Sequence, residues 1–182
     1  MSTTASKTKT MVLIALMAAV TCVLAPLSIA IPVSPVPISL TTLVLFFSAY
    51  ILGMRNCTIS YLVYLLLGLA GLPVFSGFTG GAGKLLGPTG GYLIGFIFTC
   101  LICGWTFEHS RGRWMDFLGM VAGTLVCYLF GTVWLASQAG MSFKAALGAG
   151  VIPFIPGDLA KILIALLFAP EIVKRLRTNG AL

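Results

Sequence analysis

Residues 117–136 read FLGMVAGTLVCYLFGTVWLA and contain no charged side chain. A run of about 20 predominantly apolar residues is long enough to cross the hydrocarbon core of a bilayer as a helix. The rest of the chain has the same character, because 59% of its 182 residues are hydrophobic and only 8% are charged. Soluble domains carry roughly a quarter charged residues, so this composition excludes a soluble globular fold.

Apolar runs separated by charged residues and by Gly/Pro-rich segments predict six membrane-spanning helices. They cover residues of about 11–31, 38–54, 57–73, 89–107, 115–137 and 151–170. The residues 54–56 leave room only for a tight turn, so the second and third spans are expected to form an antiparallel hairpin. Six spans of about 20 residues use most of the chain, which predicts a single all-α membrane domain over residues 1–182.

The basic residues indicate how the spans are oriented. Most of the 11 lysines and arginines lie on the side that both termini share, and only Lys84 and Lys144 lie on the opposite side. Cytoplasmic segments of membrane proteins are enriched in Lys and Arg. We therefore expect a multi-pass protein of the plasma membrane with both termini in the cytoplasm. No basic patch with interleaved aromatic residues suggests nucleic-acid binding, despite the net charge of +7.

The N-terminus also has features of a signal peptide. Lys7 and Lys9 precede an apolar stretch that ends in Ser28-Ile29-Ala30, a small-residue pattern typical of a cleavage site. Pro26 and the proline-rich segment after it fit equally well with a retained first helix. Retaining this helix gives an even number of spans, and we expect it to be retained.

The five cysteines do not predict a chemical site. Their number is odd and their spacing does not repeat, so no disulfide framework is implied. Cys100 and Cys103 form a C-x-x-C motif, but no histidine or aqueous loop lies near it. We interpret the cysteines as small packing residues and expect neither a metal nor a cofactor.

The last predicted span contains the sharpest functional signal, the sequence Pro156-Gly157-Asp158-Leu159-Ala160-Lys161. An ionisable residue within a membrane is costly unless it is paired or faces a water-filled cavity. The i, i+3 spacing of Asp158 and Lys161 places both on one face of a helix that restarts near Pro156. Asp accepts hydrogen bonds from N–H donors, and Lys donates to a carbonyl or carboxylate. The pair therefore predicts a binding site for the polar end of a ligand. The alternative is an ion pair that only fixes helix packing.

A glycine-rich segment, residues 75–92, faces the outer side together with the proline-rich residues 32–37. A phosphate-binding loop of the form G-x-x-x-x-G-K-[ST] would need Gly at 78 and Ser or Thr at 85, where this chain has Phe78 and Leu85. We expect instead a loop that closes over a pocket, with glycine backbone near the ligand and Tyr92 offering a ring and a hydroxyl. The alternative is a mobile loop with glycines that serve helix packing.

Two further groups of small or polar residues stand out. Ser39, Thr41 and Thr42 open the second span, where their hydroxyls either cap the helix or line the same cavity. Ala15 and Ala19 have a spacing that lets another helix approach closely. No Ser-His-Asp set, paired catalytic carboxylates or H-E-x-x-H motif is found, so the chain is not expected to be an enzyme.

The motifs together resemble the BioY family, the biotin-specific substrate-binding subunits (S components) of energy-coupling-factor vitamin transporters. The similarity is carried by residues 35–40, 68–75, 87–96 and 156–161. The resemblance implies a six-helix protein that captures biotin from outside. A transmembrane coupling subunit and two cytoplasmic ATPase subunits would supply the energy, which fits the absence of a P-loop motif.

The resemblance also implies roles for individual residues. Asp158 and Lys161 would contact the ureido end of biotin, and Ala15 and Ala19 would dock on the coupling subunit. The remaining ligand-binding candidates form the pocket wall or its closing loop, and they are Thr41, Phe75, Gly83, Lys84, Thr89, Gly90, Gly91 and Tyr92. From the chemistry of biotin itself, we expect its ring and aliphatic chain to lie against apolar side chains such as Phe75, Phe78 and Phe96, and its carboxylate to point toward Lys84. At Thr41 the chain departs from the family pattern, which often has Gln there.

Two other functions remain open from the sequence. One is a stand-alone secondary carrier for a small carboxylated solute, with Asp158 as a proton relay. The other is an S component for a different vitamin. Both would keep the six-helix membrane architecture and the outward-facing pocket.

Overall fold

The computed structural model describes residues 2–32 and 34–178, with side chains from Lys7 onward. Val33, in the proline-rich segment, and the end residues 1 and 179–182 of the predicted single domain lie outside this part. Within it, five helical segments are long and apolar enough to cross a membrane, namely Lys7–Leu24, Thr41–Leu69, Gly90–His109, Arg113–Ala139 and Phe143–Thr178. The protein is therefore a helical, multi-pass membrane protein.

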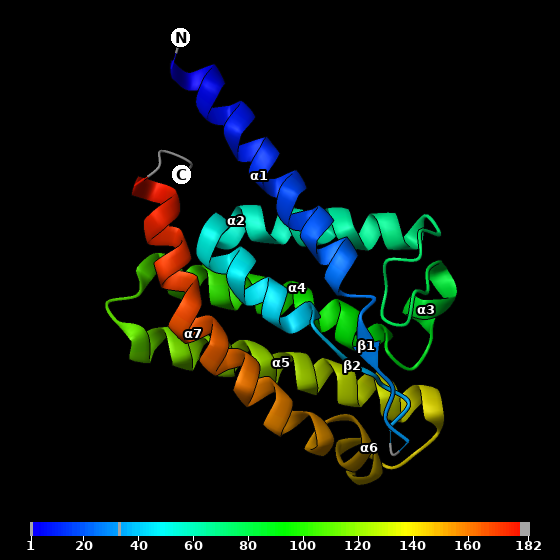
Figure 1. The fold of residues 1–182 in the computed structure, drawn as a ribbon. Coiled ribbons are helices and arrows are strands. Elements are labelled where there is room, and N and C mark those ends of the chain that lie inside the picture. The colour runs from blue at the N-terminus through cyan, green and yellow to red at the C-terminus, as the bar shows by residue number, and fades with distance from the viewer. Residues whose placement is uncertain (1, 33, 179–182) are drawn as a thin grey trace.

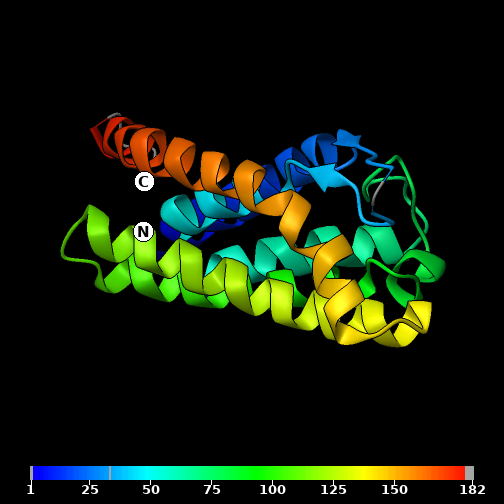
Figure 2. The same cartoon turned by 90° about the horizontal axis from the view of Figure 1, so that it is seen from below.

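The elements follow one another as α1 (Ser2–Leu24), β1 (Ser28–Ile29), β2 (Ile38–Ser39), α2 (Thr41–Leu69), α3 (Ala82–Leu86), α4 (Gly90–His109), α5 (Arg113–Ala139), α6 (Phe143–Gly150), the 3₁₀ helix η1 (Ile152–Phe154) and α7 (Ile155–Thr178). Figure 1 shows α4 and α5 running side by side, with α1 crossing α2 on the opposite side of the bundle. Helix α4 packs against both α5 and α2. The start of α1 and the end of α7 lie at the same end of the bundle (Figure 2).

The first helix ends at Leu24, whereas the predicted span continued to residue 31. Pro26 has no N–H to extend the helical hydrogen-bond ladder, and the chain becomes extended after it. Strand β1 then pairs antiparallel with β2, with Ser28 opposite Ser39 and Ile29 opposite Ile38. This short ribbon brings the start of α2 back beside the end of α1.

Helix α2 is broken at Gly53, just before the turn predicted at residues 54–56. Gly53 has φ 72° and ψ −176°, a conformation that favours glycine. Figure 1 shows the two arms of α2 folding back on each other at this point. The Glu108 carboxylate of α4 accepts the N–H of Met54 at 2.8 Å, which satisfies a backbone donor that the break leaves free.

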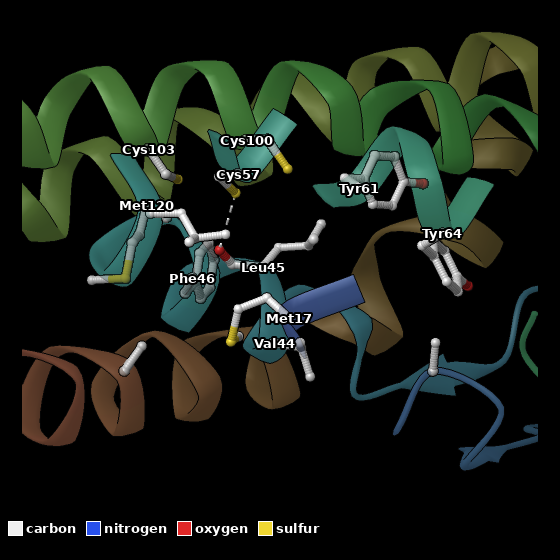
Figure 3. Packing of buried hydrophobic residues seen from close by; sticks show 14 of the residues in the cluster. Met17, Val44, Leu45, Phe46, Cys57, Tyr61, Tyr64, Cys100, Cys103 and Met120 are labelled. Carbon is white, nitrogen blue, oxygen red and sulfur yellow. Dashed lines mark hydrogen bonds between the residues drawn. The ribbon is translucent and has the colours of Figure 1, made fainter. Parts of the chain in front are cut away.

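The main core lies where both arms of α2 meet α1, α4 and α5. Figure 3 shows Met17, Leu45, Phe46, Tyr61 and Met120 converging on it. All five cysteines are free thiols, and Cys57, Cys100 and Cys103 fill small spaces in this core. The Cys57 thiol donates to the Leu45 carbonyl at 3.9 Å across the fold of α2. The cysteines thus contribute to packing, as the sequence suggested.

Candidate functional site

A cavity lies at the end of the bundle away from the chain ends. It is enclosed by the starts of α2, α4 and α7, the middle of α5, and the loop that contains α3. Of the predicted ligand-binding residues, those that line it are Thr41, Lys84, Thr89, Tyr92, Asp158 and Lys161. Its open volume is about 60 Å³, which leaves room for water but not for a bicyclic ligand unless the surrounding segments move.

Asp158 and Lys161 form an ion pair at the base of this cavity. Lys161 Nζ lies 2.8 Å from Asp158 Oδ1, and the two residues are only 9% and 7% exposed. Asp158 occupies the first turn of α7, where the helix dipole favours a negative charge. Pro156 and Gly157 lie just ahead of it in the same turn. The helix start thus places both charges on the cavity side of α7, where each can meet a polar ligand group.

Tyr128 of α5 completes a three-residue network with the ion pair. Its hydroxyl donates to Asp158 Oδ2 at 2.5 Å, while Lys161 donates to the other carboxylate oxygen. Each Asp158 oxygen keeps one lone pair for a further donor, and Lys161 keeps two N–H groups for an acceptor. The network can therefore bind a group that has N–H donors beside a carbonyl oxygen.

Tyr92 and Thr89 fix the wall formed by the start of α4. The Tyr92 hydroxyl donates to the Gly150 carbonyl at 2.7 Å, which ties α4 to the end of α6. Thr89 lies in the turn before α4 and donates weakly to the Lys84 carbonyl at 3.5 Å. The Tyr92 ring lines the cavity, but its hydroxyl is already used by the protein. Tyr92 can thus offer a ligand its ring face more readily than its hydroxyl.

The hydroxyl residues at the start of α2 line the cavity, which is one of the two roles that the sequence left open. Ser39 Oγ accepts the Thr41 N–H at 3.4 Å and donates to Thr41 Oγ1 at 3.0 Å. Ser39, Thr41 and Thr42 also line the cavity. The N-cap residue of α2 is Leu40, which makes no side-chain cap hydrogen bond, so the cluster mainly presents hydroxyls to the cavity.

Four predicted ligand-binding residues lie outside the cavity lining. Phe75 is fully buried in the main core, where its ring packs edge-on against Tyr64 at a centroid distance of 5.6 Å. Gly90 and Gly91 allow close helix contacts, because a Cβ at either position would collide with Leu85 or with Trp134 and Phe130. Gly83 lies in α3 and faces open space. Phe78, predicted to lie along the ligand, is exposed in the glycine-rich segment.

Lys84 is the third charged group of the cavity and belongs to the short helix α3. It is only partly buried, and this desolvation lowers the pKa of its ammonium group below the ordinary value. Lys84 is suited to an anionic group near the mouth of the cavity.

Sequence reasoning missed Tyr128, together with Thr124, which lines the cavity one turn earlier on α5. A tyrosine and a threonine at i, i+4 within an apolar span form a polar stripe, and that signal was available. The hydrogen bond from Tyr128 to Asp158 could not be predicted from the sequence, because it depends on how α5 and α7 pack. Ala15 and Ala19 are exposed on α1, whereas Met17 and Ala18 of the same turn are buried.

Comparison of the sequence with known protein families identifies similar proteins. The family model described as the BioY family matches residues 1–178. The chain belongs to the BioY family. It is 39% identical over 166 residues to a probable biotin transporter BioY of Pyrococcus horikoshii, which covers 91% of this chain and 97% of that relative. It is also 39% identical over 146 residues to the biotin transporter BioY of Thermotoga maritima, covering 80% and 86%.

A solved structure shares the fold of this BioY-family chain. It is the S-component for biotin from an ECF-type ABC transporter, with a TM-score of 0.86 and 32% sequence identity. The similarity covers 98% of this chain and 95% of the other. The resemblance seen in the sequence motifs is therefore confirmed at the level of both family and fold.

Proposed function

We propose that this BioY-family chain is the membrane-embedded subunit that captures biotin for uptake and is energised by separate coupling and ATPase subunits. The observation that carries the proposal is the network of Asp158, Lys161 and Tyr128, which contains a buried ion pair within a mostly apolar bundle. The ureido group of biotin has two N–H donors and one carbonyl acceptor. The free lone pairs of Asp158 and the free N–H groups of Lys161 match this set of donors and acceptors.

The rest of the cavity fits the remaining parts of biotin. Leu93, Phe96 and Phe154 line it with apolar surface suited to the fused rings and the aliphatic chain. Lys84 lies at the mouth and can pair with the carboxylate. Because the cavity is narrow, binding requires the glycine-rich loop to open and close again. Gly83 and the neighbouring glycines supply the backbone freedom for that movement.

The chain would act as one part of a larger transporter. A transmembrane coupling subunit and two cytoplasmic ATPase subunits are its expected partners, alongside biotin and the lipid bilayer. The exposed Ala15 and Ala19 give α1 a small-residue surface that a helix of the coupling subunit can approach closely. The P-loop pattern is absent from the glycine-rich segment, which is consistent with ATP hydrolysis by a separate subunit.

The membrane topology belongs to the same proposal. Counting the two arms of α2 separately gives six spans, with both termini on the side rich in basic residues, which is the cytoplasm by the positive-inside rule. The cavity then opens to the outside of the plasma membrane. Labelling of single cysteines introduced beside Lys144 and beside Lys174, in intact cells with a membrane-impermeant reagent, tests this orientation.

Biotin titration of the purified chain by calorimetry tests the site. We expect one biotin per chain and at least a tenfold loss of affinity in Asp158→Asn, because hydrogen bonds to a charged group contribute about 1.5–3 kcal/mol. Glu171→Gln, an exposed carboxylate on the same helix, is the matched control and should bind normally. Unchanged affinity in Asp158→Asn would overturn the site assignment.

Vesicle uptake separates the proposal from a stand-alone carrier. Uptake of labelled biotin should depend on the coupling and ATPase subunits and on ATP. Uptake by the chain alone that collapses with the proton gradient would instead favour a secondary carrier with Asp158 as the relay. Mass spectrometry of small molecules that co-purify with the chain would reveal a different vitamin.

A further inference from the structure

A second, wider cleft lies at the opposite end of the bundle. Figure 2 shows that α1 begins and α7 ends at this end. Its volume is about 740 Å³. It is enclosed by the first arm of α2 up to the break at Gly53, the end of α4, and the last turns of α7 from Pro170 onward. It shares no lining residue with the biotin cavity.

The charges of this cleft are separated on two walls. Glu108 stands on the α4 wall, and Lys174 and Arg177 stand on the α7 wall. All three are exposed, and within the described residues none of them takes part in an ion pair. Glu108 uses Oε1 to accept the Met54 N–H, which leaves Oε2 for another donor. The cleft thus holds an anion and two cations that face a shared space without neutralising one another.

The remaining lining is apolar and aromatic. Tyr50 and Phe107 stack with their ring centroids 3.7 Å apart, and Leu52, Pro170 and Val173 add aliphatic surface. An occupant therefore needs a polar part with both charges and an apolar part beside it. A small soluble ion would leave the apolar surface uncovered.

The level of the cleft in the membrane indicates which part of the bilayer it contacts. Trp105 and Trp114 are exposed at the same end of α4 and α5, and Trp residues concentrate at the level of the lipid headgroups. Arg111 and Arg113, in and beside the α4–α5 connection, add positive charge at this level. The cleft is thus open to lipid headgroups rather than only to the acyl chains.

We propose that this cleft binds the headgroup of an ethanolamine phospholipid. The phosphate would pair with Lys174 and Arg177, and the primary ammonium would donate to Glu108 Oε2 and lie near the Phe107 ring. The glycerol and the upper acyl chains would cover the aliphatic lining. A choline headgroup has no N–H to donate, and a glycerol headgroup has no cation for Glu108, so neither uses both walls.

Native mass spectrometry of the full chain with equal amounts of phosphatidylethanolamine, phosphatidylcholine and phosphatidylglycerol tests the proposal. We expect retention of phosphatidylethanolamine to exceed that of phosphatidylcholine by at least fivefold. Glu108→Gln should remove this preference, while its amide oxygen still accepts the Met54 N–H and keeps the break in α2. Lys174→Ala combined with Arg177→Ala should lower the retention of all three lipids.

Matched controls lie elsewhere on the chain. Glu171→Gln and Lys144→Ala remove exposed charges outside the cleft and should leave lipid retention unchanged. Equal retention of the ethanolamine and choline lipids, or an unaltered preference in Glu108→Gln, would overturn the proposal. So would full displacement of the lipid by soluble phosphoethanolamine, because the cleft would then take a water-soluble ligand. Biotin titration of the same samples keeps a failure here distinct from a failure of the biotin site.

Discussion

Helix α7 carries ionisable side chains near both of its ends, in opposite environments. Near its start, Asp158 and Lys161 are buried, joined at 2.8 Å and bound by Tyr128. Near its end, Lys174 and Arg177 are exposed on the wall of an open cleft and make no ion pair within the described residues. The same helix thus holds one charged cluster that the fold has neutralised and one that it has left available.

The difference follows from the environment of each end. A buried charge without a partner costs several kcal/mol, so the fold can hold Asp158 only together with Lys161 or a ligand that replaces it. An exposed charge is hydrated and needs no partner. Loss of a partner at the start of α7 should therefore damage both stability and binding. The same change at its end should affect only contacts with surrounding molecules.

Lys161→Met compared with Lys174→Met should give the largest contrast. Lys161→Met leaves the Asp158 carboxylate buried without its cation, and we expect it to lower the free energy of unfolding by about 3–5 kcal/mol. Lys174→Met changes an exposed residue, so its effect should stay within about 0.5 kcal/mol. Denaturant titration in detergent micelles, followed by circular dichroism, measures both.

A double variant distinguishes a folding defect from a binding defect. Asp158→Asn combined with Lys161→Met removes both charges and should recover most of the lost stability, because no unpaired charge remains. Its affinity for biotin should stay at least tenfold weaker than that of the unaltered chain. Wild-type stability in Lys161→Met alone would contradict the importance of the pair for the fold.

The two tyrosines near these charged groups offer a smaller test. Tyr128→Phe removes the hydroxyl that donates to Asp158, and we expect about a tenfold loss of biotin affinity, since a hydrogen bond to a charged group contributes about 1.5–3 kcal/mol. Tyr50→Phe alters a ring in the opposite cleft and keeps its stacking on Phe107. Its biotin affinity should not change. Equal affinities of the two variants in calorimetry would remove Tyr128 from the site.

Much of the fold could be predicted because apolar runs and proline or glycine interruptions are local signals. The fold of the chain between the second and third predicted spans was expected from the short turn, and the structure breaks α2 one residue earlier, at Gly53. At this break Glu108 of α4 accepts the Met54 N–H. A contact between residues so far apart in the chain leaves no trace in local periodicity.

The candidate site shows the same division between local and tertiary signals. Asp158 and Lys161 could be found because two charges in an apolar span are unusual wherever they pack. Gly90, Gly91 and Phe75 were grouped with them by their place in the sequence, yet they pack against neighbouring helices or in the core. Tyr128 reaches the pair only through the packing of α5 on α7. The type of a residue predicts which ligand groups it can bind. Whether the residue lines the cavity depends on how the helices pack.

The exposure of Lys84 in α3 is intermediate between that of the buried and the exposed charged residues of α7. Substitution of Lys84 should therefore have the smallest effect on biotin affinity. If its ammonium group pairs with the biotin carboxylate, Lys84→Met should weaken binding by up to about fivefold, the scale of a partly exposed ion pair. Desolvation lowers the pKa of Lys84, and only the protonated form attracts a carboxylate. The affinity of the unaltered chain should therefore fall as the pH rises through this lowered pKa, while the biotin carboxylate stays ionised. Lys84→Met should lack this part of the decline, and identical pH profiles of the two proteins in calorimetry would place the carboxylate away from Lys84.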